Sequence, residues 1–358
     1  MSPTTWKFYT RSADAWEAMY ADCSAARESI DIEQFIFGND AIGGRFFELL
    51  KRKSSEGVRI RITCDAVGSF GFLNSNVGDS LRAAGIDVVF FNRINPWRIR
   101  NFSSWFLRDH RKILLVDRSV AHIGGVGIED SMKDWRDSNV RLTGHVVSEI
   151  QAGFDRMWAT PSRYKFSQYK PLFEKGEDFS FLLNSPQFRG RYIYHDFRKT
   201  INKAKSYIYL TTPYFVPSII IFTSLIRAAR RGVDVRILVP GSSDVRIADI
   251  AAGSYFLLAL NAGIKIYIYD KNVILHAKTG VADDTWGSIG SANIDNLSLL
   301  LNFEGNLRSS DPLFIAALKQ QFMNDISVSR LLTKEDWITR PFLLKILEII
   351  TWPIHSIL

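Results

Sequence analysis

The stretch His110-Arg-Lys-Ile-Leu-Leu-Val-Asp117 recurs later in the chain as His276-Ala-Lys-Thr-Gly-Val-Ala-Asp283. In both copies one residue separates His from Lys and four separate Lys from Asp. Six further residues lead to Gly124-Gly125 in the first copy and to Gly290-Ser291 in the second. A lone His-x-Lys pair is weak evidence, but two copies with identical spacing indicate a duplicated unit.

The spacing within each motif has a chemical meaning. Residues i and i+2 of a strand project from the same face, so the histidine and lysine of each motif reach one pocket together. If the halves pack about a pseudo-twofold axis, both pairs converge on one site. One histidine can attack phosphorus while the other protonates the leaving alcohol, and the lysines and an amide can neutralise the non-bridging oxygens. This chemistry needs no metal and no cofactor, and its predicted residues are His110, Lys112, His276, Lys278 and Asn293.

A histidine that attacks phosphorus needs an acceptor that orients its second ring nitrogen. The sequence offers one carboxylate per half, Asp137 and Glu304, at nearly equal distances after the motif histidines. We therefore predict that Asp137 orients His110. By the same reasoning, Glu304 is predicted to orient His276.

The remaining motif positions are expected to support the site. Asp117 and Asp283 complete the two motifs and are counted with the catalytic residues. Because they end the motif strands, capping a turn is the more plausible role for them than proton transfer. Gly125 and Ser291, the second residues of the two pairs, are counted as supporting residues that let the backbone approach closely.

Strand-like and helix-like segments alternate in the same order in both halves. This pattern predicts an α/β fold of two similar halves. The predicted strands are 29–37, 57–63, 81–91 and 111–116 in the first half, and 206–210, 232–239 and 260–269 in the second. The predicted domains are a first half over 1–160, a connection over 161–177, a second half over 178–335 and a C-terminal tail over 336–358.

Composition sets the class of partner. The chain has 358 residues and a net charge of +8, which favours anionic partners such as an acidic membrane or nucleic acid. Its two cysteines, Cys23 and Cys64, make no disulfide framework and suit a reducing compartment. The N-terminus lacks a basic region followed by an apolar run, so we expect no signal peptide. No apolar run reaches the roughly 20 residues that a membrane-spanning helix needs.

The duplicated motif resembles the paired His-x-Lys-x4-Asp motifs of the phospholipase D superfamily, over roughly residues 25–310. Within it the chain looks most like bacterial cardiolipin synthases. The resemblance implies two α/β/α halves with the site at their interface, a covalent phosphohistidine and transfer of a phosphatidyl group between alcohols. It also favours His110 as the nucleophile and His276 as the acid. The segments that carry it are 64–69, 108–113, 135–137, 212–217, 290–295 and 301–304.

The first motif departs from the family pattern. Gly127 stands where the family usually has Asn, so one phosphate-contacting amide is missing. The Asp-Glu-Tyr that usually follows reads Asp130-Ser-Met132. A changed substrate choice or rate is therefore expected, and a scaffold protein with a weakened site is the alternative that Gly127 motivates.

The C-terminal tail points to a membrane. Lys345, Glu348, Thr351 and His355 recur at helical spacing and form one narrow polar stripe on an otherwise apolar segment, which Pro353 should kink or end. Such a helix can lie in a membrane interface. The alternative is a helix docked on the protein's own core.

The loop 93–108 interleaves tryptophan and phenylalanine with arginine, which suits anionic lipid headgroups and also single-stranded nucleic acid. The amphipathic C-terminal tail favours lipid over nucleic acid as the partner. The expected function is a cardiolipin synthase-like phosphatidyltransferase that uses an anionic phospholipid such as phosphatidylglycerol, peripheral to the cytoplasmic side of a bacterial inner membrane. A phospholipase D that forms phosphatidic acid is the alternative, and a nuclease is disfavoured. The acceptor alcohol, the nucleophile, any partner requirement and the oligomeric state stay open.

Overall fold

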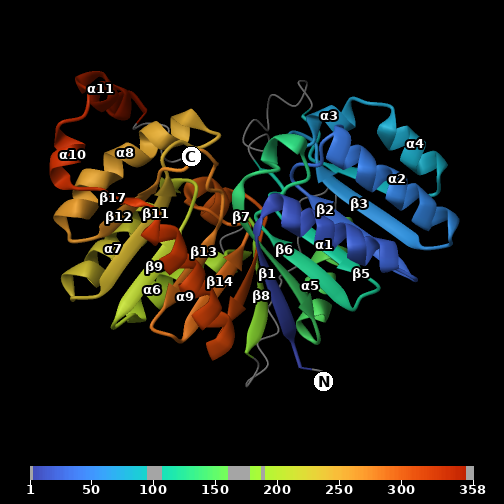
Figure 1. Cartoon of the computed structure of the whole chain (residues 1–358), viewed down its shortest axis with the longest axis horizontal. Coiled ribbons are helices and arrows are strands. Elements are labelled where there is room, and N and C mark those ends of the chain that lie inside the picture. Colours follow the sequence, from blue (N-terminus) through green and yellow to red (C-terminus); the bar gives the residue numbers. More distant parts are fainter. Residues whose placement is uncertain (1–2, 95–106, 160–177, 187–189, 352–358) are drawn as a thin grey trace.

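The protein folds as two α/β halves that stand side by side (Figure 1). The computed structural model describes residues 3–94, 107–159, 178–186 and 190–351. Within these ranges each half contains one large mixed sheet covered by helices.

The first half is built on a seven-stranded sheet of order β1-β7-β6-β5-β2-β3-β4. Its strands are β1 (Thr5–Arg11), β2 (Ser29–Gln34), β3 (Arg59–Asp65), β4 (Asp87–Phe91), β5 (Lys112–Val116), β6 (Val120–Gly124) and β7 (Arg136–Thr143). The helices are α1 (Ser12–Ala25), α2 (Ala41–Ser55), α3 (Phe70–Leu73), α4 (Val77–Ala83) and α5 (Val146–Ala159), with a 3-10 turn η2 (Asp130–Met132).

The second half repeats this plan on an eight-stranded sheet of order β17-β12-β11-β9-β13-β14-β16-β8. Its strands are β8 (Phe179–Asn184), β9 (Tyr207–Thr211), β11 (Asp234–Pro240), β12 (Lys265–Tyr269), β13 (Thr279–Ala282), β14 (Trp286–Gly290), β16 (Glu304–Ser309) and β17 (Arg330–Leu331), beside a small sheet of β10 (Phe215–Val216) and β15 (Ile294–Asp295). The helices are α6 (Tyr192–Lys203), α7 (Ile219–Arg230), α8 (Arg246–Asn261), the π-helical η4 (Leu297–Leu301), α9 (Pro312–Ser327), α10 (Lys334–Ile338) and α11 (Phe342–Thr351).

Strand direction puts each motif at the corresponding edge of its own sheet. β2, β3 and β4 run parallel, and the motif strand β5 runs antiparallel to β2. In the same way β9, β11 and β12 run parallel and β13 runs antiparallel to β9. The start of each motif strand therefore lies at the carboxyl edge of the parallel strands, where open α/β sheets commonly bind ligands.

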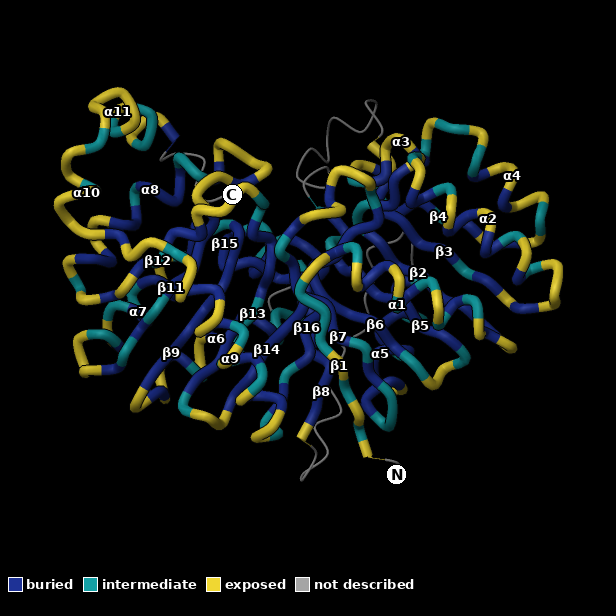
Figure 2. The backbone as a smooth tube through the Cα atoms, in the orientation of Figure 1, coloured by how far each residue is buried: buried dark blue, intermediate teal, exposed yellow. Residues whose placement is uncertain are grey.

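The strands of both sheets are mostly buried, as their dark blue colour in Figure 2 shows. Along β5, Leu114 and Val116 pack towards α1 and α2, while Ile113 and Leu115 face the opposite side. That second cluster is shared between the halves, because it also contains Phe181 of β8 and residues of α9. One continuous apolar core therefore joins the two halves and fixes the interface on which the site depends.

The predicted fold of two α/β halves is confirmed. The predicted connection 161–177 lies outside the described residues, as do 95–106 of the aromatic and basic loop and 352–358 of the tail with Pro353 and His355. Among the residues that the structure describes, no helix is long and apolar enough to cross a membrane.

Candidate active site

The two motif histidines lie at the interface of the halves, each tied by its backbone to the opposite half. His110 N donates to Phe303 O at 2.9 Å, and His276 N donates to Arg136 O at 2.8 Å. Phe303 immediately precedes Glu304, and Arg136 immediately precedes Asp137. Each backbone bond therefore lies beside the carboxylate of the opposite half. These bonds set the two halves in register at the reacting groups.

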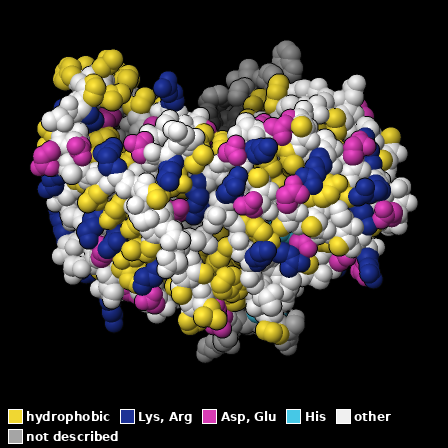
Figure 3. Space-filling view, in the orientation of Figure 1, with side chains coloured by type: hydrophobic (Ala, Val, Ile, Leu, Met, Phe, Trp, Pro, Cys, Tyr) yellow, Lys and Arg dark blue, Asp and Glu magenta, His cyan; other side chains and the backbone are white. Residues whose placement is uncertain are grey.

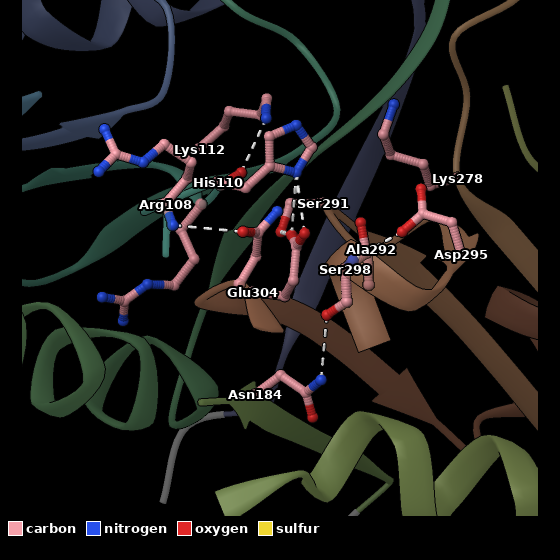
Figure 4. A network of polar contacts seen from close by, with 12 residues as sticks. Arg108, His110, Lys112, Asn184, Lys278, Ser291, Ala292, Asp295, Ser298 and Glu304 are labelled. Atoms are coloured by element: carbon pink, nitrogen blue, oxygen red, sulfur yellow. Dashed lines mark hydrogen bonds and ion pairs between the residues drawn. The ribbon is translucent and has the colours of Figure 1, made fainter. Parts of the chain in front are cut away.

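Each histidine ring is paired with the carboxylate of the other half (Figure 4 shows the first pair). His110 Nδ1 lies 2.9 Å from Glu304 Oε1, and His276 Nδ1 lies 2.7 Å from Asp137 Oδ2. The predicted pairing within each half is therefore wrong. The strand order explains the error, because β6 separates β5 from β7 and β14 separates β13 from β16. Two inter-strand spacings amount to about 9–10 Å, which is beyond hydrogen-bond reach.

Ser291 and Gly125 support these two carboxylates in different ways. Ser291 Oγ donates to Glu304 Oε2, and Gly305 N donates to Ser291 Oγ at 3.1 Å. At Gly125 a Cβ would lie 2.2 Å from Asp137 Oδ1, so only glycine leaves room for that carboxylate. Both supporting residues thus lie against the carboxylate that is paired with a motif histidine.

The two motif lysines are buried beside their histidines. Lys112 Nζ donates to His110 O at 2.7 Å, and Lys278 Nζ donates to His276 O at 2.6 Å. An ammonium group has three donors, so each lysine can offer more to a substrate oxygen. Burial lowers the pKa of Lys112 to about 7 and that of Lys278 to about 8, so Lys112 loses its charge at a lower pH than Lys278 does.

The pKa values of the two histidines are lowered to different extents. Burial, then the neighbouring Lys112 and Lys278, lowers the pKa of His110 well below its usual value. Burial and Lys278 also lower the pKa of His276, but Asp137 opposes that shift. His276 is therefore the more readily protonated of the two rings.

The two dyad carboxyls also differ. Burial raises the pKa of Glu304 to about 8, although Lys112 opposes the shift. Burial acts on Asp137 too, but His276 holds the pKa of that carboxyl below its usual value. Asp137 is therefore the more readily ionised of the two carboxyls.

The motif aspartates lie away from the reacting groups. Asp117 accepts hydrogen bonds from the backbone N–H groups of residues 27–29, and Asp283 accepts from those of residues 205–207. Both have positive φ, 48° and 51°, in the hairpin turns that follow β5 and β13. Asp117 lies seven positions along the chain from His110, which is roughly 20 Å for extended backbone at about 3.3 Å per position. Their turn-capping role is supported, and counting them with the catalytic residues was wrong.

A cavity of about 380 Å³ opens over the histidines and draws its walls from both halves. Lys112, Gly125 and Asn293 line it along with the histidines, as the motif analysis expected for a shared site. Gly127 also lines it, and its carbonyl accepts a hydrogen bond from Trp16 Nε1 at 2.8 Å. The other half's counterpart of Gly127 is Asn293, so only the second half offers a side-chain amide at this position.

Several cavity residues were not singled out from sequence. Arg108 lines the cavity and is fixed by Asp65, whose Oδ1 lies 3.2 Å from Arg108 Nη1. Tyr214 OH donates to Asp244 Oδ1 at 2.6 Å. Asp295 is buried, and burial raises the pKa of its carboxyl to about 7. Arg108, Tyr214 and Asp295 fall in the segments 108–113, 212–217 and 290–295 that carry the family resemblance and could have been found there. Asp244 comes from a separate loop that only the fold brings in.

Comparison with known proteins identifies the family. Residues 20–158 and 197–326 match the family described as "Cardiolipin synthase, PLD-like domain". The major cardiolipin synthase of Bacillus subtilis (strain 168) is 32% identical over 367 residues, covering 98% of this chain and 74% of that protein. A cardiolipin synthase of Geobacillus kaustophilus is 34% identical over 353 residues, covering 95% of this chain and 69% of that protein.

Solved structures show the same fold at low sequence identity. The phosphatidylserine synthase of Haemophilus influenzae superposes with a TM-score of 0.75 at 12% identity, covering 99% of this chain and 95% of that chain. A polyphosphate kinase from Porphyromonas gingivalis superposes with a TM-score of 0.63 at 13% identity, covering 96% of this chain and 52% of that chain. With two motif copies, an interface site and these relatives, the chain belongs to the phospholipase D-like cardiolipin synthase family, a family of phosphatidyltransferases.

Proposed function

We propose that this phosphatidyltransferase joins two molecules of phosphatidylglycerol into cardiolipin and glycerol through a covalent phosphohistidine. The proposal rests on two histidine–carboxylate pairs, or dyads, each formed between the two halves: His110 with Glu304 and His276 with Asp137. Both histidines face one cavity. Because each Nδ1 is held by a carboxylate, Nε2 is the ring nitrogen that meets the substrate.

The steps follow from the two rings. Nε2 of one histidine attacks phosphorus and forms a P–N bond. The bond from phosphorus to the oxygen of the headgroup glycerol breaks. The other imidazolium gives its proton to that oxygen. In the second step this ring takes the proton of the acceptor hydroxyl, whose oxygen attacks phosphorus as the P–N bond breaks. Water in place of the acceptor alcohol would give phosphatidic acid.

We assign the nucleophile to His110 and the acid to His276. The nucleophile must be neutral, and the pKa of His110 lies well below its usual value. The acid must begin protonated, which the ionised Asp137 beside His276 favours. Lys112, Lys278 and Asn293 then stabilise the negative charge on the non-bridging oxygens. The complete dyads in both halves support a working site over a scaffold.

The protein is further proposed to bind an anionic bilayer as a peripheral protein on the cytoplasmic side. Helix α11 supports this because its polar stripe faces inward: Glu348 is ion-paired with Arg340, and Lys345 Nζ donates to Ile338 O at 2.6 Å. The opposite face is apolar and exposed, as the cluster over α11 in Figure 3 shows. The exposed residues are Phe342, Leu343, Leu344, Ile346, Ile349 and Ile350. A helix docked through its polar side presents its apolar side to a bilayer.

Lipid product analysis tests the activity. The purified chain is incubated with phosphatidylglycerol vesicles, and wild type is compared with His110→Ala and His276→Ala. We expect cardiolipin plus glycerol from wild type and a loss of at least a hundredfold in each variant, as removal of an acid, base or nucleophile implies. Phosphatidic acid as the main product would show that the enzyme is a hydrolase and would reject the proposed transfer to phosphatidylglycerol. A phosphohistidine trapped on His276 would reverse the roles of the two rings.

Vesicle binding tests the membrane contact with a matched pair of variants. Ile349 of α11 and Leu313 of α9 are each 74% exposed. Leu313 follows β16 at its end far from Glu304, so it lies away from the cavity edge. Ile349→Ser should weaken binding to anionic vesicles several-fold, whereas Leu313→Ser should not. Equal binding by both variants would reject α11 as the contact.

A further inference from the structure

The two walls of the active-site cavity differ in chemistry. Apart from Arg108 and the motif residues, the first half contributes no polar side chain among the described lining residues. Its side chains there are Phe35, Ile36, Val67, Ile94, Met132 and Trp135. The second half adds four apolar residues and a larger polar set, comprising Tyr214, Asp244, Asn293, Asp295, Ser298 and Asn302.

The departure of the first motif from the family pattern creates this difference next to His110. Gly127 has no side chain, and a Cβ there would lie 3.0 Å from Met132 Sδ and 3.4 Å from Ile36 Cβ. The thioether and the isoleucine thus border the space that an asparagine would occupy. The Gly127 carbonyl is also taken up by Trp16, so the backbone leaves no acceptor of its own unpaired there.

Apolar side chains line the first wall both beside the reacting ring and at the surface. Phe35 packs edge-on against His110 with ring centroids 4.8 Å apart. The Phe35 carbonyl accepts from Ser69 Oγ at 2.9 Å, which ties it to the loop that carries Val67 and precedes Phe70. Both of those side chains are exposed. Hydrocarbon laid along this path would contact apolar side chains from the histidine to the rim.

The second wall is less suited to hydrocarbon than the first, because polar side chains outnumber its four apolar ones. Asp295 is buried, and Asp244 is held in place by the Tyr214 hydroxyl. Covering carboxyl and hydroxyl groups with methylenes would remove their hydration without providing new hydrogen bonds, which is unfavourable. Hydroxyls of an alcohol, in contrast, can donate to these acceptors.

We propose that the first-half wall, formed by Phe35, Ile36, Val67, Ile94 and Met132, is a binding site for the hydrocarbon chains of the phosphatidyl donor. This inference rests on the proposed function, because the reaction places the donor phosphorus at His110 and the chains are covalently attached to it. The polar second wall then faces the alcohol groups that leave and enter.

Two valines provide a matched test. Val67 is 41% exposed on the first wall, and Val245 is 37% exposed on the second. Transfer rates are measured with dibutyryl and dioctanoyl phosphatidylglycerol below their micellar concentrations, so no membrane contact contributes. We expect Val67→Ser to reduce the kcat/KM advantage of the longer chain roughly threefold to tenfold, in line with the loss of one valine contact. Val245→Ser should leave that advantage unchanged. An equal or larger effect at Val245 would overturn the proposal.

A second measurement separates this proposal from the proposed function. Phosphatidic acid with a photoreactive diazirine on its acyl chain needs no turnover, and its cross-links are mapped by mass spectrometry. We expect labels on the segments around Val67 and Met132. Labels confined to the segment around Val245 would refute the chain site even in an active enzyme. First-wall labels without transfer from phosphatidylglycerol would leave the chain site standing and reject the reaction.

Discussion

The unequal charge of the two dyads predicts unequal consequences for two isosteric substitutions, Asp137→Asn and Glu304→Gln. Each removes a carboxylate that touches a histidine Nδ1, at 2.7 Å for Asp137 and 2.9 Å for Glu304, and keeps its shape. If geometry alone mattered, the two variants would lose similar activity. If charge matters, they should differ by orders of magnitude near neutral pH.

The magnitude for Asp137 follows from its ionised state. Unit charges about 4 Å apart attract by about 4 kcal/mol at an effective dielectric constant of about 20. Loss of this attraction lowers the pKa of His276 by about 3 units, because one unit corresponds to about 1.4 kcal/mol. Burial and Lys278 already reduce the protonated fraction of His276 at neutral pH, and this loss would reduce it by about another thousandfold. We therefore expect roughly a thousandfold drop in kcat for Asp137→Asn.

Glu304 behaves differently because burial raises its pKa to about 8. At pH 6.5 its carboxyl is mostly protonated, so glutamine removes little charge and kcat should fall less than about tenfold. Above pH 8 the wild-type carboxyl ionises and can support a positive charge on His110. The loss in Glu304→Gln should therefore grow as the pH rises from 6.5 to 9.

The assay is single-turnover transfer from phosphatidylglycerol at pH 6.5 and pH 9, with thermal unfolding to verify folding of both variants. A second donor, the p-nitrophenyl ester of phosphatidic acid, has a leaving group that needs no proton. It should restore the first step in Asp137→Asn, because only the acid is impaired. Equal losses of the two variants at pH 6.5, or no rescue by the activated donor, would refute the charge assignment and the crosswise roles.

Further predictions follow from individual contacts. Gly125→Ala should abolish most activity, because its Cβ would lie 2.2 Å from Asp137 Oδ1, whereas Gly44→Ala meets no atom within 4 Å and should keep full activity in the same assay. Asp117→Ala should cost about 2–3 kcal/mol in urea unfolding, because three backbone N–H groups lose their acceptor, while kcat of the folded fraction stays unchanged. Burial lowers the pKa of Lys112 to about 7, so its charge is present below that pH and lost above it. The kcat/KM profile should accordingly fall between pH 7 and 8, and Lys112→Arg, which stays charged, should move this fall to higher pH at reduced maximal rate.

The sequence was sufficient for the motif residues and insufficient for their pairing. His110 and Lys112 could be identified because period-2 spacing and exact repetition are local properties of the chain. The partner of His110 could not, because Glu304 reaches it only through the packing of two sheets. Equal distances along the chain suggested pairing within a half, yet the strand that intervenes in each sheet makes that pairing impossible.

The tail shows the same limit at the surface. Helical spacing predicted the polar stripe with Lys345 and Glu348, since amphipathicity is encoded locally. Which face docks on the protein depends on Arg340 and α8, and the docked face is the polar one. From the spacing of the apolar residues alone, one would have predicted that the apolar face of α11 packs against the protein.

The two halves share the same motif, but the side chains around it differ. These differences favour one orientation of the bound donor lipid. The first half places a neutral His110 beside the apolar wall that Gly127 and Met132 complete. The second places the more basic His276 beside ionised Asp137 and polar groups. A phosphatidyl donor has a hydrocarbon end and an alcohol end, so only one orientation matches both walls. That orientation puts phosphorus before the nucleophile and the departing glycerol oxygen before the acid. In the proposed reaction the same wall then receives the acceptor hydroxyl, so the step that forms the phosphohistidine and the step that resolves it would use one proton-carrying residue.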